Sequence, residues 1–374
     1  MIPLNNRERT RAILNYENAD RIPVVHFGFW DECYALFEAQ GHIPVMKNED
    51  GTDRHLTESE VFSLLGFDFG WGSITGANNG LLPGFETKVV KEFPDGGRHV
   101  LNSNGVTVWH KPGKTSIPAE ISHTLVDRES WEKEFLPRLR PGPDRYPKLS
   151  PEVVRRINSS TDPVGVHCGS LYGTFRDWAG FTGTCYILAD DEELFGEILR
   201  TLADICYDGV KAILDAGVKP DFGHFWEDIC FKNGPLVNPA VFDEYCGPGY
   251  ERITGLLKEH GCGICSLDCD GCIDSLIPTW LENGVNTMFP IEVGTWNASI
   301  GPWRQKYGRA LRGVGGMDKR VFAMDYAAVD AEIERLRPLV ELGGFIPCPD
   351  HRIPPDAKWD NILYYTDKFR KVFG

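Results

Sequence analysis

The chain has 374 residues, a length that suits one large decorated domain. Its formal net charge of −15 argues against nucleic acid or an anionic membrane as a partner, because like charges repel. The chain contains no run of about 20 apolar residues, so we expect no membrane-spanning helix. The first residues form a charged helical pattern unlike a signal peptide, and the eleven cysteines are spread along the chain. We therefore expect reduced thiols and a cytoplasmic protein.

Strand signals are sparse in the first half of the chain. After the charged helical pattern at the start, short apolar runs predict buried strands at 22–27, 67–71 and 164–169. The interval 85–118 differs, because it alternates polar with apolar residues and contains Gly-Gly and Asn-Gly turn pairs. This pattern predicts an inserted antiparallel β-meander. The segment that follows, 127–151, is rich in Pro, Arg and Glu and predicts a surface excursion.

In the second half of the chain, predicted strands and helices alternate with short connecting loops. Glycine follows most of the predicted helices, as expected for a helix stop. The predicted helices are 192–216, 239–260, 273–282, 302–307 and 326–342, and the predicted strands are 221–227, 263–270, 286–291, 310–315 and the run from 343. About eight strands alternating with helices predict an α/β fold, a TIM (β/α)8 barrel. We expect one barrel domain over 1–374 with an N-terminal helical extension and an insertion at about 85–150, which covers the barrel mouth.

Reactive side chains cluster where the predicted strands end. The carboxyl ends of barrel strands meet at one face, which is where such folds bind substrate. A single acidic residue there could be a helix cap, but so many strands ending this way are hard to explain as caps alone. The set comprises His26, Trp30, His167, Glu227, Asp228, Asp268, Cys269, Asp270, Glu292, Asp318, Cys348, Asp350 and His351.

The alternation of side chains along a strand predicts which face each residue of the cysteine-rich stretch 262–272 takes. Successive side chains of a strand point to opposite faces, so Asp268 and Asp270 share one face and Cys269 takes the other. If the aspartates face the barrel mouth, Cys269 packs outside as a small hydrophobe. The pairs of cysteines here are too close together for a structural zinc ribbon.

Aromatic residues surround the end of the first strand, in the segment HFGFWDE at 26–32. They are either ordinary core or the wall of a site for an aromatic substrate. Phe27 and Trp30, with Trp226 and Glu292 from later strand ends, are our candidates for substrate binding. The chain has no GxGxxG, GxxxxGK[ST] or GxSxG motif, so nucleotide-dependent and α/β-hydrolase chemistry have no motif support.

Four stretches resemble the uroporphyrinogen decarboxylase family, including its corrinoid-linked methyltransferase branch. Most of them lie in the C-terminal half and follow the family's order. They are DRIPV at 20–24, DCDGCIDSLIPTWLENGVNTMFPIEVG at 268–294, YGRALRGVGGMDKR at 307–320 and GGFIPCPDHRIPPDAKWDNI at 343–362.

The resemblance implies a changed substrate and a changed metal site. The family's porphyrinogen decarboxylases carry arginines after the first strand, and the segment HFGFWDE lacks them. The methyltransferase branch holds zinc with a His-x-Cys-Gly motif, which aligns with 268–271, and a later cysteine, which aligns with His351. Our candidate metal ligands are Glu227, Asp270, Cys348 and His351, with Asp268 in reserve and Cys269 still possible.

The expected activity is that of the substrate-specific methyltransferase of a corrinoid system. It would move a methyl group from a small donor, with an aryl methyl ether as the best guess, to a separate corrinoid protein. This O-demethylation would use zinc as a Lewis acid, and His167, His26 and Asp270 would orient or protonate the donor. The alternatives are a decarboxylase acting on a substrate smaller than a porphyrinogen, and a binding barrel without catalysis.

Overall fold

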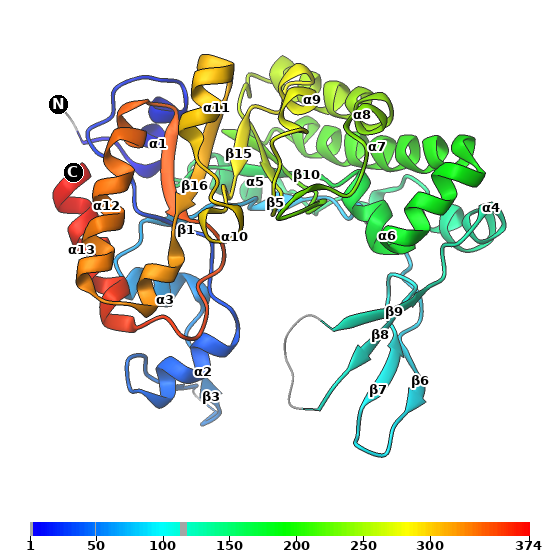
Figure 1. Ribbon diagram of the computed structural model, residues 1–374, viewed down its shortest axis with the longest axis horizontal. Helices are drawn as coiled ribbons and strands as arrows, with labels where there is room; N and C mark the ends of the chain where they lie inside the picture. The colour runs from blue at the N-terminus through cyan, green and yellow to red at the C-terminus, as the bar shows by residue number, and fades with distance from the viewer. Residues whose placement is uncertain (1–2, 49, 113–117) are drawn as a thin grey trace.

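A parallel β-sheet forms the centre of the molecule (Figure 1). The computed structural model describes residues 3–48, 50–112 and 118–374. Seven parallel strands pair in the order β17, β16, β15, β14, β11, β10, β5. Their bounds are β5 Thr75–Gly76, β10 Gly165–Gly169, β11 Phe222–Trp226, β14 Cys265–Asp268, β15 Thr287–Phe289, β16 Arg312–Met317 and β17 Phe345–Pro349. The prediction of an α/β protein with a parallel sheet is therefore confirmed.

A separate parallel pair lies beside this sheet. It consists of β1 (Val25–His26) and β4 (Phe69–Gly70). The segments that follow β1 and β17 meet at a parallel bridge between Phe29 and Ile353, where the Trp30 amide donates to the Ile353 carbonyl at 3.1 Å. Within the described residues no strand ladder joins β17 to β1, so closure into an eight-stranded barrel is not detected.

Thirteen α-helices are present in the described parts of the chain, and most of them cover the parallel sheet (Figure 1). All five helices predicted in the second half are found, with ends shifted by at most a few residues. Their bounds are α1 Asn6–Leu14, α2 Glu32–Ala39, α3 Glu58–Leu64, α4 Arg128–Ser130, α5 Pro151–Asn158, α6 Tyr172–Asp190, α7 Glu192–Asp215, α8 Pro239–Glu259, α9 Ile277–Glu282, α10 Val293–Trp296, α11 Ile300–Tyr307, α12 Tyr326–Glu341 and α13 Trp359–Phe373. None of the described helices is both long and apolar enough to cross a membrane.

The inserted segment forms a four-stranded antiparallel meander, as the sequence predicts. Its strands are β6 Lys88–Glu92, β7 Arg98–Leu101, β8 Val106–His110 and β9 Ala119–His123. Figure 1 shows it projecting from the parallel sheet below α6, next to which β9 lies. The contact depends on Gly180, which has φ 69° at a kink in α6, because an added Cβ would lie 2.5 Å from the ring of His123.

Helix α1 covers the amino-terminal ends of the strands. Its residues Ile13 and Leu14 belong to the same buried cluster as Phe222 of β11, Ile346 of β17 and Ile264, which directly precedes β14. The charge on Asp221, just before β11, is neutralised by Arg7 at 2.8 Å. This end of the sheet is therefore filled by packed side chains. We expect an accessible active site at the carboxyl ends of the strands.

Candidate active site

Asp270 and His351 lie against each other at the carboxyl ends of the strands. Asp270 follows β14, His351 follows β17, and Nε2 of the histidine lies 3.1 Å from Oδ2 of the aspartate. The other oxygen of Asp270, Oδ1, is buried and has no hydrogen-bond partner within the described residues. A buried carboxylate oxygen without a partner is unfavourable on its own, so the pair is suited to receive a ligand.

An aromatic wall lies against His351. The indole of Trp30 stacks on the imidazole with ring centroids 5.5 Å apart, and Phe27 meets it edge-on at 5.5 Å. Phe27 also contacts Phe289, at the end of β15, at 4.5 Å. The structure thus brings two of the candidate substrate-binding residues next to His351, which with Asp270 was a candidate metal ligand.

Three further carboxyl groups surround Asp270. Burial raises the pKa of Asp268 well above its ordinary value, and the charges of Asp270 and Asp228 raise it further. The pKa values of Asp228 and Glu292 are raised by the same two causes, burial first and the charge of Asp270 second. Glu292 is held by the Gly271 amide, which donates to it at 2.6 Å. Because these carboxyl groups are buried and close together, they keep their protons to a higher pH than isolated carboxyl groups would.

The interior beneath these carboxyls contains two histidines. His167 on β10 and His224 on β11 are partners in the strand register, and Trp226 is the register partner of Asp268. His224 also meets the ring of Phe289 at 5.9 Å. We did not single out His224 from the sequence, although strand alternation places it on the same face as Trp226.

Glu227 lies on the opposite side of β11 from this site. Its fully buried carboxylate accepts hydrogen bonds from the amides of Leu171 and Gly173, both at 2.7 Å, and from the hydroxyls of Ser170 and Tyr250. It therefore caps the start of α6. The ligand set expected from the sequence is corrected here, because these donors already engage both carboxylate oxygens.

No contact among the described residues joins His26 or Cys348 to the Asp270–His351 pair. The ring of His26 stacks on Phe62 of α3, with centroids 3.4 Å apart, and burial lowers the pKa of His26 to about 3. Cys348 is fully buried in the cluster that contains Val25 and Ile346, and burial raises the pKa of its thiol. Neither side chain is placed to act at the pair in this structure.

The expected zinc site does not assemble from these four residues. Only Asp270 and His351 meet, and across the described residues no group of three or more His, Cys, Asp or Glu is arranged to hold a metal ion. Cys269, the other possible ligand, is buried on the outer side of β14, where the Ile229 amide donates to its sulfur at 3.4 Å. The residues present therefore do not fit the predicted ligand set.

A second group of charges links the site to the meander. Arg176 on α6 lies 2.8 Å from Asp177 and 3.8 Å from Asp228, which follows β11. On the other side, Nε2 of His123 lies 3.2 Å from Oε2 of Glu120, both on β9. Glu120 raises the pKa of Asp177 and His123 lowers it. Burial raises the pKa of Asp177 to about 6, against the opposing effect of Arg176.

The raised pKa of Asp177 predicts a pH-dependent stability difference. A carboxyl whose pKa is higher in the folded state loses native stability as pH rises from its unfolded value, about 4, through about 6. Asp177→Asn is therefore expected to raise the melting temperature relative to wild type more at pH 8 than at pH 4, by thermal denaturation. Asn in place of the exposed Asp367 is the control. An equal effect of Asp177→Asn at both pH values would contradict the assignment.

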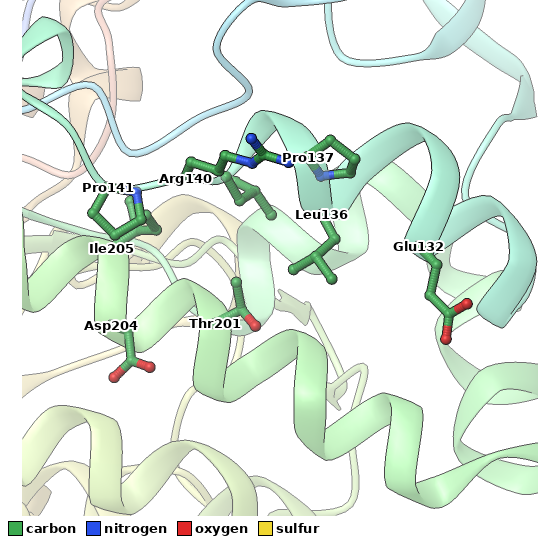
Figure 2. Close-up of a pocket in the computed structure, with 9 residues that line it drawn as sticks. Glu132, Leu136, Pro137, Arg140, Pro141, Thr201, Asp204 and Ile205 are labelled. Atoms are coloured by element: carbon green, nitrogen blue, oxygen red, sulfur yellow. The ribbon is translucent and has the colours of Figure 1, made fainter.

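A separate pocket of about 480 Å³ lies on the outer surface, between α7 and the short helical turns at 131–138 (Figure 2). Leu136, Arg140, Thr201 and Asp204 are among its lining residues. None of the predicted site residues lines it. This pocket is therefore distinct from the Asp270–His351 site.

Comparison with known proteins supports the fold. No family profile matches the chain, and no curated protein matches it. A solved methyltransferase from Methanosarcina mazei is 12% identical, covers 99% of both chains and superposes with a TM-score of 0.58. A B12-independent methionine synthase from Shewanella sp. W3-18-1 is also 12% identical, with coverage of 94% of this chain and 98% of the other and a TM-score of 0.46. The first likeness indicates that this chain and the methanogen protein share a fold.

Proposed function

We propose that the chain is an enzyme that transfers a methyl group from a small aryl methyl ether to the corrinoid of a separate protein. The observation that carries this proposal is the Asp270–His351 pair, set against Trp30 and Phe27 where the strands end. The shared fold with a methyltransferase and the resemblance of the sequence motifs support the same reaction class. We also propose that the chain is one cytoplasmic barrel domain, in which β1, β4 and the seven-stranded sheet close on each other.

The pair supplies the proton that the leaving oxygen needs. An electron pair from the acceptor forms the bond to the methyl carbon, and the carbon–oxygen bond breaks with its electrons on oxygen. His351 in its protonated form gives that oxygen a proton, and Asp270 orients the ring and stabilises its charge. Because Nε2 of His351 faces Asp270, Nδ1 of His351 is the nitrogen that would give its proton to the oxygen of the methyl donor.

The neighbouring groups complete the site. Trp30, Phe27 and Trp226 are flat apolar surfaces for an aromatic ring. Asp268 and Glu292, whose raised pKa values favour their neutral forms, limit the negative charge around the departing phenol. The reduced corrinoid of the partner supplies the nucleophile. No step of this mechanism depends on zinc, since the predicted ligand set does not assemble.

A turnover assay tests the proposal. The purified chain is incubated with a panel of aryl methyl ethers and reduced cobalamin in place of the partner protein, and phenol formation is followed by chromatography. We expect loss of the ether that depends on both the enzyme and the acceptor. Absence of acceptor-dependent loss across the panel would refute methyl transfer. Release of carbon dioxide from the matching aromatic acids would instead identify the decarboxylase alternative.

A further inference from the structure

His224 is a buried polar side chain that the proposed mechanism does not use. It is 7% exposed on the inner face of β11, and its Nδ1 is fully buried with no hydrogen-bond partner within the described part of the chain. A neutral imidazole carries one donor and one acceptor, and leaving either unpaired in a buried position costs stability. The unpaired Nδ1 of His224 therefore points to a ligand that would bind there.

The groups around His224 are uncharged or apolar. His167 and Ser266 are its register partners on either side, and the Ser266 hydroxyl already accepts a hydrogen bond from the indole of Trp71 at 3.1 Å. The rings of Phe222 and Phe289 meet His224 edge-on at 6.1 and 5.9 Å. Burial, and to a smaller extent His167, lower the pKa of His224 to about 3, so the imidazole stays neutral near pH 7.

Access to this position comes from the carboxyl ends of the strands. His167 is only half-buried although it lies on the inner face of β10, and so are Trp226 and Phe27 nearer the mouth. A side chain that keeps exposed surface on an inner face adjoins open space. The helix α1 fills the opposite end. A ligand of the two histidines would therefore enter from the carboxyl ends of the strands, past Trp226.

We propose that His224, with His167 beside it, forms an inner polar subsite that binds a hydroxyl group on the aromatic ring of the methyl donor. This inference rests on the proposed function and names its substrate class, a methoxyphenol. A hydroxyl both donates and accepts, which matches an imidazole with one N–H and one lone pair. An anionic group is disfavoured, because the buried imidazole of His224 is neutral and offers no positive charge to pair with it.

The spacing favours the two oxygens at opposite ends of the ring. His224 pairs in register with Ser266, and Asp268 is two residues further along β14, a rise of about 7 Å. A ring with its hydroxyl at His224 then presents a para-methoxy group toward the level of Asp268, the last residue of β14, after which Asp270 follows. The donor that fits is a 4-methoxyphenol rather than its 2-methoxy isomer.

Equilibrium binding tests the subsite without any turnover. We compare 4-methoxyphenol with methoxybenzene, which lacks only the hydroxyl, by calorimetric titration of the full chain without acceptor. Wild type is expected to bind 4-methoxyphenol at least about tenfold more tightly. His224→Phe should remove this preference, and His224→Asn should keep part of it because an amide retains a donor and an acceptor. Tyr365→Phe is the matched control, since it removes another buried polar atom without a partner in the described residues, the hydroxyl of Tyr365 on α13, and should not change the preference.

Each outcome supports or overturns the subsite. Equal binding of the two ligands by wild type, or no saturable binding of either, overturns it. A preference that survives in folded His224→Phe, checked by thermal denaturation, overturns it as well. If His224→Phe fails to fold, the wild-type preference and its reduction in His224→Asn decide. A preference lost with His224 in a protein that shows no methyl transfer keeps the subsite and refutes the proposed function alone.

Discussion

Asp270→Asn is expected to lower the rate of methyl transfer by about 10²–10⁴-fold, the range that a general acid contributes. Asparagine retains the size of the side chain, but it cannot stabilise a protonated His351 by charge. The buried Oδ1 position, which has no hydrogen-bond partner within the described residues, becomes either a neutral carbonyl or an amide. Measurement of kcat and KM with saturating reduced cobalamin checks this, and the loss should fall mainly on kcat, because the aromatic wall that binds the donor is unchanged.

Asp274→Asn is the matched control for this variant. Asp274 lies four residues further along the same segment and accepts a hydrogen bond from the indole of Trp303 at 2.6 Å, which an asparagine oxygen also accepts. It should turn over at the wild-type rate. If Asp270→Asn keeps the wild-type kcat while remaining folded, the Asp270–His351 pair has no part in the chemistry and the proposed mechanism falls.

Glu227→Ala is expected to destabilise the protein by roughly 3–5 kcal/mol, because several buried donors lose their acceptor at about 1–3 kcal/mol each. The change leaves two amides at the start of α6 and the hydroxyl of Tyr250 without their acceptor, in a position closed to water. Urea denaturation followed by circular dichroism measures the difference in the free energy of unfolding. The exposed Glu259→Ala, at the end of α8, should shift it by less than about 0.5 kcal/mol.

The same variant separates two roles for this carboxylate. A metal ligand would lose metal and activity with a small effect on folding, whereas a cap of α6 loses stability first. Tyr250→Phe removes one of the hydrogen bonds to Glu227 and should destabilise by a smaller amount, about 1–2 kcal/mol. A stability of Glu227→Ala equal to wild type would show that the hydrogen bonds at the start of α6 do not depend on it.

The sequence predicts that chemistry-bearing residues from several strands lie at one end of the sheet, because parallel strands converge at their carboxyl ends. Asp270, His351, Phe27 and Trp30 come from strand ends far apart in the chain, and the topology alone brings them together. Glu227 shows the limit of that reasoning. Position along a strand does not fix direction, and the alternation that we applied to 268–270 would also have turned Glu227 away from Trp226.

Other features depended on contacts that no local pattern reveals. Helix α6 was not predicted, since its three glycines, including the kinked Gly180, weaken the helical signal. The partner of Glu227 is the start of that same helix, so the cap could not be foreseen without it. His26 was assigned to the site because it ends a strand, but its neighbour Phe27 is the residue that faces inward.

Under the proposed function, the packing of Ile13 and Leu14 against one end of the strands has a kinetic consequence. With that end filled by α1, the methyl donor and the methyl acceptor would both approach from the carboxyl ends of the strands. A partner protein docked there would cover the path of the donor, so the donor would bind first and the phenol would leave last. Steady-state kinetics with the two substrates would then follow a compulsory-order sequential pattern.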